Sequence, residues 1–537
     1  MLGRISWMLL LVLLFLVLLS GPAAAQLRVE NNQQLFHPTG QGSFGASIAI
    51  ADMDGDGLQD LVVGNPEKVF NGKFRDIPNV GEIAIIPNQQ GQFPTDSFFW
   101  DRYIQSTGQQ PNFIGRVDED DFFGHAVATG DFNADGLADI AIGAPGDHFS
   151  VDGMPIMLSL GSITVGNQDD GGSSFVSQRV WRQAAPDVQS PATSIVPGNA
   201  EDGERFGWAL AVGDFNGDGF DDLAVGVPGE TLDGTANATG AVNVIFGRSG
   251  VGLDGDGAQF LHQATPGIVG AAEAGDEFGH ALAAGNFNCD GYDDLVVGIH
   301  KEDIGDVTDA GAAVVLYGGP SGLGTEVLPT ESFHQGRGDV RGNAEVGDRF
   351  GSSLASGDFN GDGCDDLAVG VPFEDVNTVG TAGAVAVFYG SSANGLTADD
   401  DEFITGGWAE ETESGDRFGT TLATGDFNDD GKDDLVVSVP GEEYDGGPTD
   451  SGAVNILYGS DAGLVATGSE VWHAGTPGII GDPQPTSEFG TGLATGRLNL
   501  GDKDDLVIGV PWSPPEWGTV HVLLTDGPFF LDGFEGD

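Results

Sequence analysis

The chain has 537 residues, of which 83 are acidic and 19 are basic, so its formal net charge is -64. A charge of this sign and size opposes binding to nucleic acid or anionic membranes and favours cations or basic partners. The two cysteines are too few for a scaffold held together by disulfides, and the length is ample for a large core.

The first 25 residues are typical of an export signal. An apolar run from Ile5 to Leu19 follows Arg4, and a Gly-Pro-Ala-Ala-Ala stretch ends at Ala25. This order predicts a signal peptide over residues 1–25, cleaved after Ala25. No later run approaches the roughly 20 apolar residues that cross a bilayer. We therefore expect a secreted, extracellular protein that is soluble and not inserted in a membrane after cleavage.

One unit of about 70 residues then recurs seven times, which is typical of a repeat architecture. Each copy predicts four short strands: one before an Asp-rich loop, one directly after it, a third that starts with Gly, and a looser fourth. Such units predict an all-β fold, a seven-bladed β-propeller of four-stranded blades over residues 26–527, with 528–537 as a C-terminal tail. The copies open with the Phe-Gly pairs at Phe44, Phe123, Phe206, Phe278, Phe350, Phe418 and Phe489.

The array of repeats does not begin and end at the same strand of the unit. The seventh copy ends after its third strand, at Leu524, whereas the chain that remains after cleavage opens with a spare fourth strand at Leu35-Phe36-His37. We expect this N-terminal strand to complete the last blade and to close the ring without an open edge. The alternative is a frayed N-terminus.

Six copies carry a nine-residue pattern, Asp/Asn-x-Asp/Asn-x-Asp-Gly-x-x-Asp, between the first two strands. Alternate oxygen ligands and a Gly at the sharp turn predict calcium, at about six sites. The expected side-chain ligands are Asp52, Asp54, Asp56 and Asp60; Asp131, Asn133, Asp135 and Asp139; Asp214, Asn216, Asp218 and Asp222; Asn286, Asn288, Asp290 and Asp294; Asp358, Asn360, Asp362 and Asp366; and Asp426, Asn428, Asp430 and Asp434. Backbone carbonyls are expected from the seventh position: Leu58, Leu137, Phe220, Tyr292, Cys364 and Lys432.

An EF-hand is the competing interpretation, but it needs a bidentate Glu at the twelfth position and flanking helices. Here the twelfth position is apolar in all six loops, as at Val63 and Ile142. The seventh copy departs from the pattern, with Arg497 at the first ligand position and Gly501 at the third. We expect that site to be empty, with Arg497 paired to Asp502 or Asp505.

The two cysteines fall inside the loops of consecutive repeats. Cys289 and Cys364 form either a disulfide between neighbouring blades or two separate thiols, and the sequence leaves both alternatives open.

Together these features resemble the FG-GAP repeat family, the seven-bladed propeller also found at the head of integrin alpha subunits. The resemblance covers Leu35 to Leu524 and rests on the Phe-Gly openers, the Asp-rich loops and Gly-Ala-Pro-like ends such as Gly143-Ala144-Pro145. It implies a recognition platform with calcium in the loops of one face and ligands or partner subunits on the other. The leg domains and membrane helix of integrin alpha chains have no counterpart here, which favours a secreted propeller over a receptor subunit.

We therefore expect a calcium-binding recognition or adhesion module for an extracellular protein or glycan, and not an enzyme. The alternatives are an extracellular hydrolase or lyase on the same scaffold, and a passive surface or matrix protein. Histidines recur at equivalent repeat positions, which favours packing over catalysis: His37, His262, His334 and His473 at one, and His125 and His280 at another. The tripeptide Arg337-Gly338-Asp339 is expected to occur by chance.

Overall fold

The computed structural model describes residues 33–36, 42–71, 76–89, 92–93, 98–101, 119–150, 157–159, 161–168, 175–184, 193–199, 201–232, 238–324, 328–407, 412–443, 447–480, 482–512 and 518–525. Within these ranges every regular element is a strand. None of the described residues forms a helix long and apolar enough to cross a membrane. The expected signal peptide, His37 and the C-terminal tail lie outside the described residues, so those expectations stay predictions.

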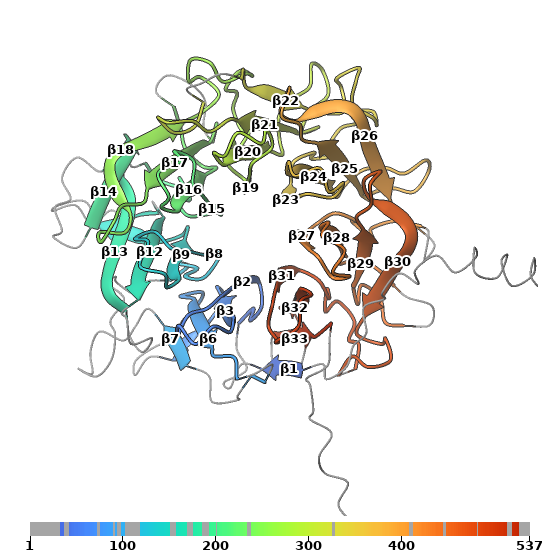
Figure 1. Ribbon diagram of the computed structural model, residues 1–537, viewed down its shortest axis with the longest axis horizontal. Helices are drawn as coiled ribbons and strands as arrows, with labels where there is room; N and C mark the ends of the chain where they lie inside the picture. Colours follow the sequence, from blue (N-terminus) through green and yellow to red (C-terminus); the bar gives the residue numbers. More distant parts are fainter. Residues whose placement is uncertain are drawn as a thin grey trace, which may run out of the picture.

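Seven sheets stand around a central axis as the blades of a ring (Figure 1). The first four blades are β2 (Ser47–Ala51), β3 (Asp60–Asn65), β6 (Glu82–Ile86) and β7 (Phe98–Asp101); β8 (Val127–Gly130), β9 (Asp139–Ala144), β12 (Ser162–Gln168), β13 (Phe175–Ala184) and β14 (Thr193–Asn199); β15 (Leu210–Gly213), β16 (Asp222–Val227), β17 (Ala241–Phe246) and β18 (Asp254–Leu261); and β19 (Ala281–Gly285), β20 (Asp294–Ile299), β21 (Ala312–Leu316) and β22 (Glu331–Phe333).

The last three blades are β23 (Ser353–Gly357), β24 (Asp366–Val371), β25 (Ala384–Tyr389) and β26 (Thr397–Thr405); β27 (Leu422–Gly425), β28 (Asp434–Val439), β29 (Ala453–Tyr458) and β30 (Val465–His473); and β31 (Gly492–Gly496), β32 (Asp505–Val510), β33 (Thr519–Leu523) and β1 (Gln33–Phe36). Two small hairpins, β4 (Phe70–Asn71) with β5 (Asp76–Ile77) and β10 (His148–Ser150) with β11 (Met157–Ser159), lie between the second and third strands of the first two blades. The predicted seven-bladed propeller is confirmed.

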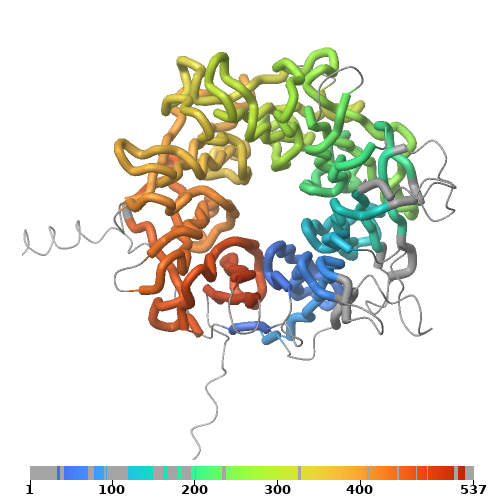
Figure 2. The backbone as a smooth tube through the Cα atoms, turned by 180° about the vertical axis from the view of Figure 1, so that it is seen from behind, coloured from blue at the N-terminus to red at the C-terminus, as the bar shows by residue number. Residues whose placement is uncertain are grey.

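The N-terminal strand closes the ring as predicted. β1 pairs antiparallel with β33, with Leu35 opposite Val520 and Phe36 opposite Thr519. From behind, the blue N-terminal blade and the red C-terminal blade lie side by side (Figure 2). One detail differs from the expectation, because the second blade has a fifth strand, β14, which runs parallel to β13. Val196 of β14 is buried in the apolar layer shared with the third blade, which explains why this longer connection stays on the sheet.

The apolar core is divided among the junctions between blades. Seven clusters of buried side chains each join two consecutive blades, including one that joins Val507, Val520 and Val522 of the last blade to Leu61 and Val63 of the first. Every second strand is buried along its whole length, because neighbouring blades cover both of its faces. These strands are therefore continuous apolar runs without alternation.

The Phe-Gly pairs form the contacts between blades. The Gly before each third strand makes a parallel bridge with the next Phe: Gly81 with Phe123, Gly161 with Phe206, Gly240 with Phe278, Gly311 with Phe350 and Gly383 with Phe418. A Cβ on Gly452 or Gly518 would fall 2.3 Å from the Phe489 nitrogen or 2.5 Å from the Phe44 nitrogen, so the same close approach occurs at the other two junctions. These seven glycines have φ between 75° and 96°, where other residues are strained.

Candidate metal centres

The Asp-rich loops lie together at one end of the ring. Each joins the first and second strands of a blade, and the antiparallel pairing of these strands puts the Phe-Gly pair at the opposite end. We call the end formed by loops 52–60, 131–139, 214–222, 286–294, 358–366 and 426–434 the aspartate-loop face. The end that carries the Phe-Gly pairs is called the Phe-Gly face.

The first loop brings three carboxylates together. One oxygen each from Asp52, Asp54 and Asp60 lies within 4.8 Å of the other two. Asp52 is fixed by the backbone N–H groups of Gly55 and Gly57, which donate to its two oxygens at 2.7 and 2.8 Å. The loop therefore presents converging anionic oxygens, the donor set that Ca²⁺ prefers.

The other loops repeat the backbone hydrogen bonds of the first. In four of them the first Asp accepts a 2.9 Å hydrogen bond from the Gly at the sixth position: Asp131 from Gly136, Asp214 from Gly219, Asp358 from Gly363 and Asp426 from Gly431. In the fourth loop Asn286 Oδ1 accepts instead from the Asp290 N–H at 3.1 Å. In all six loops the N–H of the seventh residue donates to the Asp at the fifth position, at 2.9 to 3.1 Å.

The ninth position holds a buried Asp that ties the loop to the sheet. Asp222, for example, accepts the Phe215 N–H at 3.1 Å and the Gly247 N–H at 2.8 Å. Burial, with a smaller effect from the other loop carboxylates, raises the pKa of this group to about 7 in Asp60 and to about 8 in Asp222, Asp294, Asp366 and Asp434. A bound cation would oppose that shift and keep the carboxylate ionised.

Two buried amide oxygens in the loops lack a donor. Asn133 Nδ2 donates to Asp139, and Asn428 Nδ2 donates to Asp434. The Oδ1 atoms of Asn133 and Asn428 are buried and accept no hydrogen bond. A buried carbonyl-type oxygen is expensive to leave without a partner, and a hard cation would supply one. The residues therefore fit calcium by their chemistry.

The eighth position was missed by the sequence reasoning. Asp221, Asp293, Asp365, Asp433 and Asp504 each accept, through Oδ2, the N–H of the first residue of the preceding blade's loop, at 2.7 to 3.0 Å. Gln59 Oε1 accepts the Arg497 N–H at 2.6 Å and continues this link across the ring closure. The signal was the Asp-Asp pair before the second strand in five of the repeats, which the nine-residue pattern treated as a variable position.

The seventh loop corrects one expectation. Arg497 Nε lies 3.7 Å from Asp504 Oδ1, rather than beside Asp502 or Asp505. Asp505 is buried, and its oxygens accept hydrogen bonds from the backbone N–H groups of Leu498 and Thr525. Its place in the sheet therefore takes it out of reach of the exposed guanidinium.

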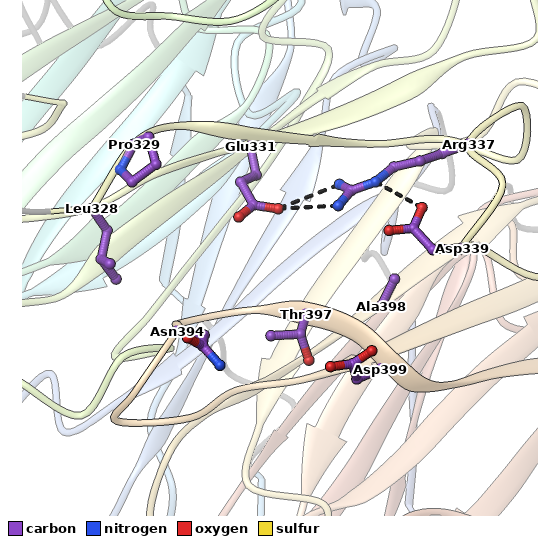
Figure 3. A pocket seen from close by; sticks show the side chains of 9 residues that line it. All are labelled: Leu328, Pro329, Glu331, Arg337, Asp339, Asn394, Thr397, Ala398 and Asp399. Atoms are coloured by element: carbon purple, nitrogen blue, oxygen red, sulfur yellow. Dashed lines mark hydrogen bonds and ion pairs between the residues drawn. The ribbon is translucent and has the colours of Figure 1, made fainter.

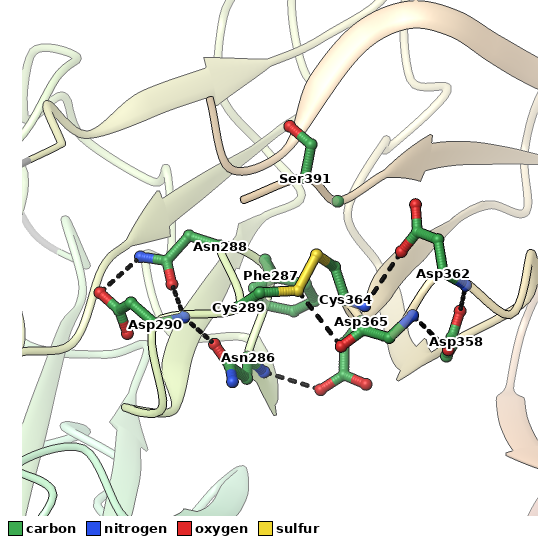
Figure 4. Close-up of a disulfide and its surroundings, with 12 residues drawn as sticks. Asn286, Phe287, Asn288, Cys289, Asp290, Asp358, Asp362, Cys364, Asp365 and Ser391 are labelled. Carbon is green, nitrogen blue, oxygen red and sulfur yellow. Dashed lines mark hydrogen bonds between the residues drawn. A yellow bond between two sulfur atoms is a disulfide. The ribbon is translucent and has the colours of Figure 1, made fainter. Parts of the chain in front are cut away.

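A disulfide joins two of the loops. Cys289 in the fourth loop and Cys364 in the fifth are bonded, with their Cα atoms 5.1 Å apart (Figure 4). The same contact between the fourth position of one loop and the seventh of the next recurs elsewhere: a Cβ on Gly217 would lie 2.4 Å from Tyr292, and one on Gly361 would lie 3.0 Å from Lys432. The repeat geometry thus brings the two cysteines together, and the structure contains the bridge rather than two thiols.

Arg337 and Asp339 of the Arg-Gly-Asp tripeptide line a pocket of about 390 Å³ between the outer parts of the fourth and fifth blades (Figure 3). Arg337 is tied back to its own blade, with its Nε 2.9 Å from Asp339 and its guanidinium 3.3 Å from Glu331. It also donates to the Ser332 carbonyl at 2.8 Å. The arginine is thus paired within the chain, and the expectation that the tripeptide occurs by chance stays a prediction.

A model of the FG-GAP repeat family matches six segments of the chain, residues 44–74, 123–154, 206–245, 278–316, 350–388 and 418–457. The chain carries FG-GAP repeats. The matched segments begin at the first six Phe-Gly pairs, and the seventh blade, with its altered loop, falls outside the match.

Relatives of this chain include integrin alpha subunits and a phospholipase D. Integrin alpha-5 of Xenopus laevis is 26% identical over 399 residues, which are 72% of this chain and 32% of that protein. Phosphatidylinositol-glycan-specific phospholipase D of Bos taurus is 34% identical over 190 residues, 35% of this chain and 21% of that protein. The chain thus spans 32% and 21% of the length of these two relatives.

Two solved structures share much of the chain's length. BBS1N in complex with ARL6DN has a TM-score of 0.45 at 10% identity, covering 93% of this chain and 98% of that one. Rhamnogalacturonan lyase YesW has a TM-score of 0.39 at 12% identity, covering 93% and 75%. At these TM-scores neither structure bears on the function of the FG-GAP chain.

Proposed function

We propose that the protein is an exported, calcium-binding propeller that recognises an extracellular protein or glycan. Calcium occupies the six loops of the aspartate-loop face, held by the side chains at positions one, three, five and nine and by the carbonyl at position seven. The observation that carries this proposal is the convergence of three carboxylate oxygens in the first loop, with the Oδ1 atoms of Asn133 and Asn428, in two further loops of the same length, buried and without a donor.

Calcium would hold the loops in one conformation. Without it, carboxylates about 4 Å apart repel each other by roughly 1 to 4 kcal/mol per pair, depending on screening. Calcium modules outside cells often have dissociation constants of roughly 10⁻⁴ to 10⁻³ M, so occupancy depends on the external calcium concentration. The Cys289–Cys364 bridge supports an extracellular location, because disulfides persist in oxidising compartments.

Recognition is assigned to the Phe-Gly face. The hairpins β4–β5 and β10–β11 extend this face in the first two blades, where the chain departs from the pattern of its sibling repeats. Aromatic rings from three consecutive blades also lie in a row here, because the His125 and Trp208 ring centroids are 4.4 Å apart and those of Trp208 and His280 are 5.7 Å apart. Loops that depart from a repeat are favoured places for binding.

Two measurements test the proposal. We expect EDTA to lower the melting temperature by several degrees, and excess calcium, but not magnesium at equal ionic strength, to restore it; an unchanged melting temperature contradicts structural calcium. We further expect binding to an array of matrix proteins and glycans in calcium, lost with Trp208→Ala on the Phe-Gly face. Leu500→Ala, an exposed change on the other face, should retain it. Binding unaffected by Trp208→Ala contradicts the assigned face.

The second candidate is an extracellular hydrolase or lyase. The identity to the phospholipase D relatives favours it, although it is confined to a minor part of their length. The pocket beside Arg337, lined by Glu331, Asp339 and Asp399, offers the carboxylates that such chemistry uses. Turnover of a phosphodiester or polysaccharide by the purified chain, abolished by Glu331→Gln, would replace the recognition proposal with this one.

A further inference from the structure

Three side chains of the fourth blade surround one point on the Phe-Gly face. Glu277 precedes the Phe-Gly pair, His280 follows it, and His300 comes directly after β20. A ligand atom from each lies within 4.8 Å of the other two. Glu277 Oε2 is 3.9 Å from His280 Nδ1 and 3.7 Å from His300 Nε2.

These separations are too long for hydrogen bonds but suit ligands that share an ion. Two ligand atoms about 2.1 Å from a tetrahedral zinc ion lie roughly 3.4 Å apart, so small side-chain movements would complete the site. His280 Nδ1, the nitrogen nearest the carboxylate, is buried and has no hydrogen-bond partner. The two imidazole rings are held close together, with centroids 3.6 Å apart.

The contacts of Glu277 leave one of its oxygens for the imidazoles. Arg205 and Lys301 contact the other oxygen of Glu277, Oε1, at 2.8 and 3.0 Å, and leave Oε2 for the imidazoles. Burial raises the pKa of Glu277, but these two hydrogen bonds outweigh it and lower the pKa overall, so the carboxylate is ionised. Burial lowers the pKa of His280 to about 4 and that of His300 to about 2, which leaves both rings neutral, the form that binds metals.

The combination of Glu277, His280 and His300 occurs in the fourth repeat and in none of the other six. His300 stands where the other six copies have proline: Pro66, Pro145, Pro228, Pro372, Pro440 and Pro511. The position of His280 holds Ala46, His125, Trp208, Ser352, Thr420 and Thr491 in the other copies. Repetition of histidine at the latter position favoured packing, yet only the fourth copy combines both histidines with a glutamate before the Phe-Gly pair.

We propose that Glu277, His280 and His300 bind a first-row transition metal ion, with zinc the best fit, on the Phe-Gly face. Two imidazoles and one carboxylate are ligands that suit zinc and its neighbours, whereas calcium prefers oxygen alone. The His280 side chain is 22% exposed, so a fourth coordination position is open to water or to an acidic group of a ligand. The site goes beyond the proposed function and is separate from the calcium loops.

The test is zinc binding to the mature full-length protein in millimolar calcium, which fills the aspartate-loop sites. We expect crystals soaked in zinc to show anomalous density at the zinc edge among the three side chains. In solution, His300→Pro and His280→Thr, which restore residues of sibling repeats, should each weaken zinc binding by about tenfold or more. Cobalt should give visible absorption bands that the same variants remove.

Matched controls separate this site from general zinc binding. His334→Gln, a change at a half-buried histidine directly after β22, should leave zinc affinity unchanged, and a normal melting temperature shows that each variant is folded. If His300→Pro does not fold, Glu277→Gln tests the same site. Zinc density only in the Asp-rich loops, or unchanged affinity in the folded variants, overturns the proposal.

Discussion

Carboxylates in this chain serve two purposes that depend on their position in the loop. Those at the eighth and ninth positions are integral to the ring, because they accept backbone hydrogen bonds between strands and between blades. Those at the third and fifth positions, such as Asp54 and Asp56, are exposed on the aspartate-loop face. The exposed carboxylates at the third and fifth positions can be replaced without disturbing the sheet. Substitutions there therefore test calcium binding without unfolding the blade.

Asp54→Ala should remove one calcium ion from the protein and reduce the rise in melting temperature that calcium produces. The reason is that the first loop then loses one of its three clustered carboxylates. Calorimetric titration and thermal unfolding measure the two effects. The matched variant is Asp502→Ala in the seventh loop, where no calcium is expected. Equal calcium stoichiometry in the two variants would contradict the assignment of the first loop.

Glu204 predicts a pH effect on stability. Its side chain is buried, it accepts the Glu201 N–H, and burial with the nearby Glu230 raises its pKa to about 9. Because the folded pKa lies above the ordinary value of 4.5, the stabilising contribution is complete below that value and is lost progressively as the pH rises to about 9. We expect Glu204→Gln to be more stable than the parent at pH 8, by on the order of 1 to 3 kcal/mol.

Urea unfolding at pH 5 and pH 8, in constant calcium, measures this effect. The stability difference between Glu204→Gln and the parent should shrink toward zero at pH 5, where the parent's glutamate is protonated when folded. Asp202→Asn, an exposed neighbour, should follow the parent at both values. If the stability of Glu204→Gln depended on pH as that of the parent does, the raised pKa of Glu204 would be contradicted.

Among the strands, β1 is the one that closes the ring. It completes the last blade by pairing with β33. Leu35 is 9% exposed and packs into the cluster between the last and first blades, whereas its neighbour Phe36 is 47% exposed. Alternation along the strand thus puts one residue in the core and the next in solvent. The two positions form a matched pair for testing closure.

Leu35→Asp should lower the free energy of unfolding by roughly 2 to 5 kcal/mol, because it loses apolar burial and places a charge in the core. Phe36→Asp should change it by less than about 0.5 kcal/mol, as exposed substitutions do. The denaturation midpoint of each variant is the measurement. Similar midpoints for the two would show that β1 does not close the ring.

Across the propeller, the features that recur in every repeat could be predicted from the sequence. The hydrogen bonds that link one blade to the next could not. The number of blades, the closing strand and the loop positions follow from spacing, because each copy repeats the same alternation of strand and turn. Arg497 pairs with Asp504, and five Asp residues at the eighth position link neighbouring blades. The links through the eighth position depend on how one blade faces the next, which the spacing within one copy does not give. The choice of Asp504 by Arg497 depends on the burial of Asp505 in the sheet, where backbone N–H groups occupy its oxygens.

The grouping of His280 and His300 also could not be predicted from the sequence. Their recurrence favoured packing, and the sequence places His280 and His300 twenty residues apart. Only the antiparallel pairing of β19 with β20 brings the two onto one end of the blade, beside Glu277. β14 also escaped prediction, because its parallel pairing with β13 has no equivalent in the other copies.

The most direct test of the account is a crystal structure of the mature protein grown in millimolar calcium, with the ions located by anomalous scattering. We expect calcium in the loops that begin at Asp52, Asp131, Asp214, Asn286, Asp358 and Asp426, and none in the loop that begins at Arg497. Empty loops at that calcium concentration, or an ion bound in the seventh loop with the others vacant, would contradict the assignment of calcium to these six loops.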